Sequence, residues 1–62
     1  MSFRIYILRH RNIRSRGILV VRDDGTGVAV LEDIIIVDQG KNIKKQLKRR
    51  GYMLMQVYEL DE

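Results

Sequence analysis

The fold is decided by residues 18–31, which read ILVVRDDGTGVAVL. Two runs rich in β-branched residues, 18–22 and 28–31, flank the polar stretch DDGTG at 23–27. An Asp-Gly pair between two such runs is a strong hairpin signal, because Asp and Gly tolerate the positive φ of a tight turn. We therefore expect an antiparallel hairpin here. The first run, ILVVR, is continuous in residues that favour β-structure, which is typical of a strand covered on both faces.

Three further segments have strand character. Alternation of side chains predicts strands at 2–9 and 52–60, and four β-branched residues in a row favour a strand at 34–37. Residues 10–17 are polar and contain Asn, Ser and Gly, so we expect a loop there. Whether 28–37 is one bulged strand or two strands joined by a tight corner stays open. In the last strand, the alternation sets Met53, Met55 and Val57 opposite Tyr52, Leu54, Gln56 and Tyr58.

One helix is expected, over residues 41–50. Asp38 or Asn42 can cap its start, and Gly51 suits the left-handed residue that ends a helix. At about 100° per residue, the inner face holds Ile43, Gln46, Leu47 and the stem of Arg50. The opposite face carries Lys41, Lys44, Lys45, Lys48 and Arg49.

The element order is therefore β-β-β-(β)-α-β, in one domain over residues 1–62. This order predicts an α+β fold: a small, strongly bent antiparallel or mixed sheet, or a partly open barrel, of four to five strands with one helix. A crossover helix could make 34–37 and 52–59 parallel neighbours.

A chain of 62 residues is near the lower limit for folding on one hydrophobic core. It has no cysteine, so neither disulfides nor thiolate-bound zinc can stabilise it. We therefore expect a homodimer or a larger homo-oligomer. No apolar run approaches the ~20 residues that cross a bilayer, and the N-terminal stretch lacks signal-peptide features. We expect no membrane partner and a cytoplasmic location, which is the host cytoplasm if the chain is virus- or plasmid-encoded.

Catalytic groups are scarce. One histidine, two serines and no cysteine leave little for nucleophilic catalysis. His10 stands between Arg9 and Arg11, and a solvated loop residue is a simpler interpretation than a base for RNA cleavage. Five carboxylates within 23–38 come from a hairpin tip, a corner and a helix start, so pairing with basic segments explains them more simply than a metal site. We expect no enzyme, no cofactor and no metal.

Charge is strongly segregated along the chain, whose net charge is +4. Residues 1–22 hold six arginines and no acid, and 41–50 hold six basic residues. Residues 23–40 hold five acids and no base, and 51–62 hold three acids. Basic blocks can bind polyanions, but blocks of opposite sign can also neutralise one another in the fold.

The basic blocks predict a small protein that binds the phosphates of DNA or RNA, without a motif that reads bases. A regulatory or accessory role would fit such a protein. The predicted contacts are Arg9, Arg11, Arg14, Arg16, Lys41, Lys44, Lys45, Lys48 and Arg49. Bases of a single strand could stack on Tyr6, Tyr52 or Tyr58.

The alternative is a protein-interaction module, such as a small regulator or inhibitor that docks on a larger protein. It is suggested by the alternating charge blocks and by the last strand, whose methionines adapt to varied surfaces. A shared basic face formed by 9–16 and 41–50 would favour nucleic acid, whereas ion pairs between these segments and the acidic blocks would weaken that hypothesis.

Overall fold

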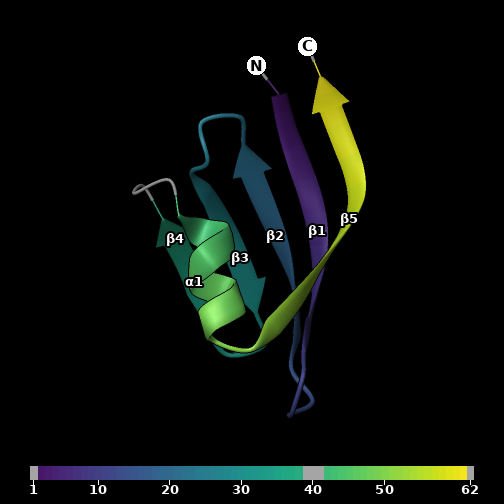
Figure 1. Ribbon diagram of the computed structural model, residues 1–62, viewed down its shortest axis with the longest axis vertical. Coiled ribbons are helices and arrows are strands. Elements are labelled where there is room, and N and C mark those ends of the chain that lie inside the picture. Colours follow the sequence, from purple (N-terminus) through teal and green to yellow (C-terminus); the bar gives the residue numbers. More distant parts are fainter. Residues whose placement is uncertain (1, 39–41, 62) are drawn as a thin grey trace.

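The computed structural model describes residues 2–38 and 42–61. Its five strands form one open antiparallel sheet, with a single short helix on one side (Figure 1). The strands are β1 (Ser2–His10), β2 (Arg16–Arg22), β3 (Gly27–Leu31), β4 (Ile35–Asp38) and β5 (Tyr52–Asp61), and the helix is α1 (Ile43–Arg49). The predicted α+β class is confirmed, and the sheet does not close into a barrel.

The predicted hairpin at 23–27 joins β2 and β3, which pair from Val21 with Gly27 to Gly17 with Leu31. Gly25 has a φ of 88°, the left-handed conformation that the turn requires of this position. Asp24 Oδ1 accepts hydrogen bonds from the backbone N–H and the hydroxyl of Thr26, at 2.9 and 2.6 Å. The Asp side chain therefore holds the turn in shape.

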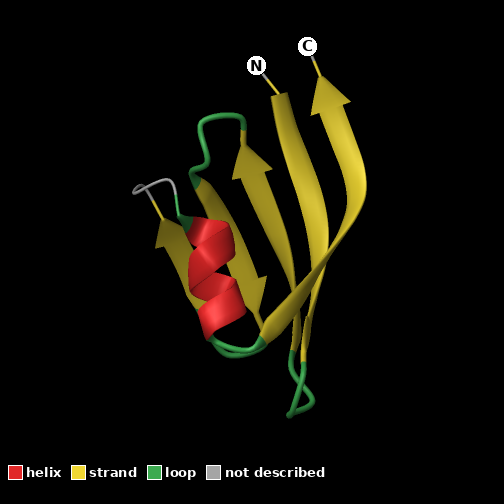
Figure 2. Ribbon diagram, viewed as in Figure 1, coloured by secondary structure: helices red, strands yellow, loops and turns green. Residues whose placement is uncertain are grey.

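The order across the sheet is β4-β3-β2-β1-β5. Residues 28–37 form two strands, because the chain turns at 32–34 and the N–H of Leu31 donates to the carbonyl of Ile34 at 2.9 Å. The predicted parallel pairing of 34–37 with 52–59 is wrong: β4 and β5 lie at opposite edges with three strands between them. The connection through α1 passes over one face of the sheet to reach the far edge (Figure 2).

The helix is shorter than the predicted span of 41–50, and Asn42 occupies its N-cap position without a capping hydrogen bond from its side chain. Asp38 belongs to β4, and Lys41 lies outside the described residues. Gly51 has a φ of 96° and ends the helix as expected, with its N–H donating to the carbonyl of Lys48. Arg50, whose stem was expected on the inner face, is an exposed C-cap residue.

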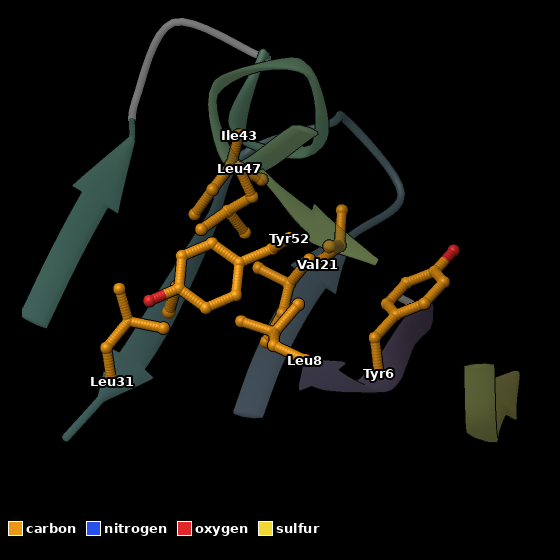
Figure 3. Packing of buried hydrophobic residues seen from close by; sticks show 9 residues of the cluster. Tyr6, Leu8, Val21, Leu31, Ile43, Leu47 and Tyr52 are labelled. Atoms are coloured by element: carbon orange, nitrogen blue, oxygen red, sulfur yellow. The ribbon is translucent and has the colours of Figure 1, made fainter. Parts of the chain in front are cut away.

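The core lies between α1 and the face of the sheet that the helix covers. Figure 3 shows Ile43 and Leu47 pointing from the helix toward the sheet, with the ring of Tyr52 beside them. All described strands except β4 contribute buried side chains. The buried apolar residues are Tyr6, Leu8, Leu19, Val21, Ala29, Leu31, Ile43, Leu47 and Tyr52.

Strand β5 contains an irregularity that its sequence did not predict. Tyr6 pairs with Gln56 and Ile5 pairs with Tyr58, so β5 has one extra residue, Val57, at this point. Directly opposite residues project to the same face. Tyr58 therefore lies on the same face as Met55, not opposite it, and the continuous alternation predicted for 52–60 is wrong beyond Gln56.

Candidate functional site

The connection between β1 and β2, residues 11–15, is an arginine-bearing loop anchored at both ends. The N–H of His10 donates to the carbonyl of Ser15 at 2.9 Å, and the N–H of Arg11 donates to the carbonyl of Gly51 at 2.9 Å. The buried Ser15 hydroxyl lies 2.6 Å from the hydroxyl of Tyr52 in β5. These bonds tie the loop to the end of the helix, so its arginines are displayed on an ordered support.

His10 is the central anchor of this junction. Its Nε2 lies 2.6 Å from the carbonyl oxygen of Arg50, and its Nδ1 accepts from the backbone N–H groups of Asn12 and Ile13 at 3.0 and 3.3 Å. With Nδ1 accepting, Nε2 must donate to the carbonyl, which is the pattern of a neutral imidazole. The ring also packs edge-on against Tyr52, with centroids 4.9 Å apart. The predicted solvated loop histidine is instead a structural residue whose two nitrogens are both engaged.

The two basic segments meet in one hollow of about 400 Å³ beside the helix. Arg11 reaches it from the loop, while Lys44 and Lys48, one turn apart, reach it from α1. The rest of its lining is aromatic or apolar: Tyr6, Tyr52, Met53 and Leu54. Three positive charges thus converge on a surface whose lining holds no carboxylate, which makes it the strongest candidate for binding an anion.

Lys44 is held in place within this hollow. Its Nζ donates to the hydroxyl of Tyr6 at 3.1 Å and lies 5.1 Å from the centre of the same ring. A tyrosine ring attracts a cation placed near its face. The contact fixes the ammonium group without neutralising it, so its charge remains available to a ligand.

Arg9 and Arg16 form a second basic group next to this hollow. They are direct cross-strand partners in β1 and β2, on the face of the sheet away from the helix. Like charges in this position repel each other. They border a hollow of about 540 Å³ with Met53 and Met55. An anion bound between the two guanidinium groups would relieve the repulsion.

The other predicted basic contacts are dispersed. Lys45 and Arg49 border a separate depression on the helix with Asn42 and Gln46. Arg14 lies on the loop in a shallow hollow with Arg9 and Arg16, among others. The structure therefore unites one residue of the loop with two of the helix.

Within residues 2–38 and 42–61, no basic residue of 9–16 or 42–50 forms an ion pair with a carboxylate. Arg4 Nε in β1 does form an ion pair with Glu59 Oε1, its cross-strand partner in β5, at 3.7 Å. The described residues also contain no group of three or more histidine or acidic side chains placed to hold a metal ion. The described basic residues of 9–16 and 42–50 thus keep their charge for solvent or for a ligand.

The tyrosines have distinct environments. Tyr6 and Tyr52 belong to the core and are each 6% exposed, so a base could reach only their edges, and we leave both rings out of the proposed interface. Tyr58 is 51% exposed because the extra residue in β5 turns it to the uncovered face. Met53 and Leu54, which line the hollow, were missed from the sequence. The position of Tyr52 directly after the helix-ending Gly51 was the available signal that the start of β5 lies against the helix.

No protein-family model, no curated protein and no solved structure matches this chain. No helix of the described residues is long and apolar enough to cross a membrane.

Proposed function

We propose that this protein binds nucleic acid through its phosphates, with the hollow formed by Arg11, Lys44 and Lys48 at the centre of the interface. The observation that carries the proposal is the convergence of these three cations from segments more than thirty residues apart, in a lining without a carboxylate. A solubilising helix face does not require an arginine from a distant loop to join it. The arrangement instead resembles what phosphate binding needs, which is concentrated positive charge on an ordered support.

The chemistry of the three side chains suits a phosphodiester. The Arg11 guanidinium can donate two parallel hydrogen bonds to a phosphate, and the lysines act as point charges beside it. Lys44 and the loop are already held by Tyr6, His10 and Ser15. Less conformational freedom is therefore lost on binding. Arg9 and Arg16 extend the interface along the backbone of a longer ligand.

The proposal includes no base-specific contact, since phosphate contacts position a protein on nucleic acid but carry no sequence information. DNA and RNA, single- and double-stranded, are therefore compared directly in the test. The measurement is fluorescence anisotropy of labelled oligonucleotides titrated with protein at several salt concentrations. Binding should weaken linearly in the logarithm of salt concentration.

The deciding variant replaces Arg11, Lys44 and Lys48 with glutamine. If each contacts one phosphate, the salt slope should fall by about 2.7 for duplex DNA and about 2.1 for a single strand. The matched control replaces three basic residues outside the hollow, Lys45, Arg49 and Arg50, with glutamine. It has the same net charge, so it reports what general electrostatics alone contributes.

Equal losses in the two variants would remove the hollow from the interface and leave only non-specific attraction. Absence of binding by the wild-type chain at low salt would refute the proposal as a whole. The uncovered face of the sheet supports the alternative function, a protein-interaction module.

A further inference from the structure

The face of the sheet opposite α1 is apolar and uncovered. The register of the four strand pairs places ten residues on it in two continuous rows that each cross all five strands. One row is Val37, Val28, Val20, Ile5 and Tyr58. The other is Ile35, Val30, Ile18, Ile7 and Met55. We call these two rows the apolar band.

The side chains of the band are strongly exposed, including those on the central strands of the sheet. Ile35, Met55 and Val37 are 67%, 65% and 62% exposed, and Ile18 and Val30, in the middle of the sheet, are 53% and 50% exposed. The whole chain exposes 4658 Å², compared with roughly 4,200 Å² expected for a folded monomer of this mass. A contiguous apolar surface of this extent marks an interaction site in a soluble protein.

The borders of the band have the composition of a protein interface. Phe3, Arg22 and Leu60 form the next row at one end, and Arg9, Arg16 and Met53 form it at the other. Aromatic residues, methionine and arginine are enriched at interfaces, whereas lysine and acidic residues are depleted. No lysine, aspartate or glutamate lies in any of these four rows. The band is therefore an apolar centre whose border rows contain three arginines, Arg9, Arg16 and Arg22.

We propose that a second copy of this chain covers the apolar band, with the two sheets packed face to face. Eight of the ten side chains in the band are more than a third exposed, and a stable interface of standard size buries about 800 Å² from each partner. Two twisted sheets of this width pack in this way, about 10 Å apart, in β-sandwiches. The five-strand band can pack against a copy of itself, because both surfaces carry rows of side chains with the same spacing.

The sequence of β2 agrees with this arrangement. Its run 18–22 predicted a strand covered on both faces, yet a single chain covers only the face that holds Leu19 and Val21. Ile18 and Val20 face outward in one chain and would be buried in the pair. A second copy gives β2 the surroundings that its sequence predicts.

The test is the mass of the protein in solution, measured by sedimentation equilibrium from about 1 μM to about 1 mM, which spans dissociation constants typical of specific complexes. The wild-type chain should sediment at twice the 7.3 kDa mass of one chain over most of this range. The deciding variant combines Ile18→Lys with Val30→Glu. These residues are direct cross-strand partners, so the opposite charges support the sheet of one chain while they disfavour its burial.

The variant should raise the dissociation constant of the dimer at least 100-fold and keep the circular dichroism spectrum of the wild type. The matched control combines Lys45→Glu with Asp61→Lys, which places a glutamate and a lysine away from the band at the same unchanged net charge and should sediment like the wild type. A wild-type chain that stays monomeric, including one whose band is covered by a different protein, overturns the proposal. A dimer that persists in the Ile18→Lys/Val30→Glu variant also overturns it, because the contact then lies elsewhere, such as the β5 edge.

A measurement on the wild-type chain decides the matter if that variant does not fold. Met55 lies in the band and is 65% exposed in one chain, so peroxide should oxidise it rapidly in the monomer. Its oxidation rate should fall at least tenfold as the dimer becomes populated. A rate close to that of free methionine in a solution of dimers would show that the band is open, and would refute face-to-face packing.

Discussion

Replacing Gly51 with alanine tests the junction where the helix, the arginine loop and β5 meet. Gly51 has a φ of 96°, a conformation that residues with a Cβ rarely adopt. A Cβ added here would lie 2.7 Å from Nε2 and 2.9 Å from Cε1 of His10. Alanine therefore strains the backbone and also forces the imidazole ring away from its position.

The expected cost follows from these two effects. The left-handed conformation costs a residue with a Cβ about 1 kcal/mol. Displacing the ring breaks the hydrogen bond between His10 Nε2 and the carbonyl of Arg50, which contributes about 1 kcal/mol more. The free energy of unfolding should therefore fall by about 2 kcal/mol, out of the ~3–9 kcal/mol expected for a domain of this length.

The measurement is urea and thermal unfolding followed by far-ultraviolet circular dichroism, at one fixed protein concentration so that any self-association contributes equally. The loss corresponds to a decrease in Tm of roughly 10–20 °C. A double-mutant cycle separates the two effects. In a His10→Ala background the ring is absent, so Gly51→Ala should cost only about 1 kcal/mol, the backbone part.

Two results would refute this reasoning. A Gly51→Ala protein within about 0.5 kcal/mol of the wild type would show that the junction adapts freely. The same cost in both backgrounds would show that the His10 ring contributes no steric effect.

Two further substitutions test the core and the buried pair of hydroxyls formed by Ser15 and Tyr52. Leu47 is fully buried in the helix, so Leu47→Ala should lower the free energy of unfolding by about 2–5 kcal/mol. Lys45→Ala, on the exposed side of the same helix, should change it little. Equal effects of the two substitutions would contradict the assigned orientation of the helix. Tyr52→Phe should lower the free energy of unfolding by about 1–3 kcal/mol, because it leaves the Ser15 hydroxyl without its partner. Combining it with Ser15→Ala should recover part of that stability. Additive losses of stability in the same urea titration would show that the two hydroxyls do not interact.

Local signals in the sequence predicted the strands and their hairpin well. The Asp-Gly turn and the β-branched runs act over a few residues, so nothing distant can override them easily. Gly51 as the end of the helix has the same local origin. The length of the helix was less certain, because a basic stretch gives no clear start and the side chain of Asn42 makes no capping bond.

The order of the strands in the sheet, and the face to which the side chains near the end of β5 project, could not be predicted from local signals. A helical connection can reach either a neighbouring strand or the far edge, and the sequence of α1 does not distinguish them, so the position of β4 relative to β5 was predicted wrongly. The extra residue Val57 leaves no mark in the MLMQVYEL pattern, although it changes the face to which Tyr58 projects. Which residues of the basic loop and the basic helix meet in one hollow depends on these long-range pairings, and among the described residues Arg11, Lys44 and Lys48 do so.

The pairing of β1 with β5 also governs when this protein can fold during its synthesis. β1 is made before the other four strands of the sheet, but one of its two neighbours is β5, the fifth of them along the sequence, with Ser2 opposite Asp61. The β2–β3 hairpin can form early, because its contacts are local. The core around Leu8, however, can form only after Tyr52 and Leu54 of β5 have been made. We therefore expect nascent chains that end before β5 to expose the future core, and to depend on chaperones until translation reaches β5.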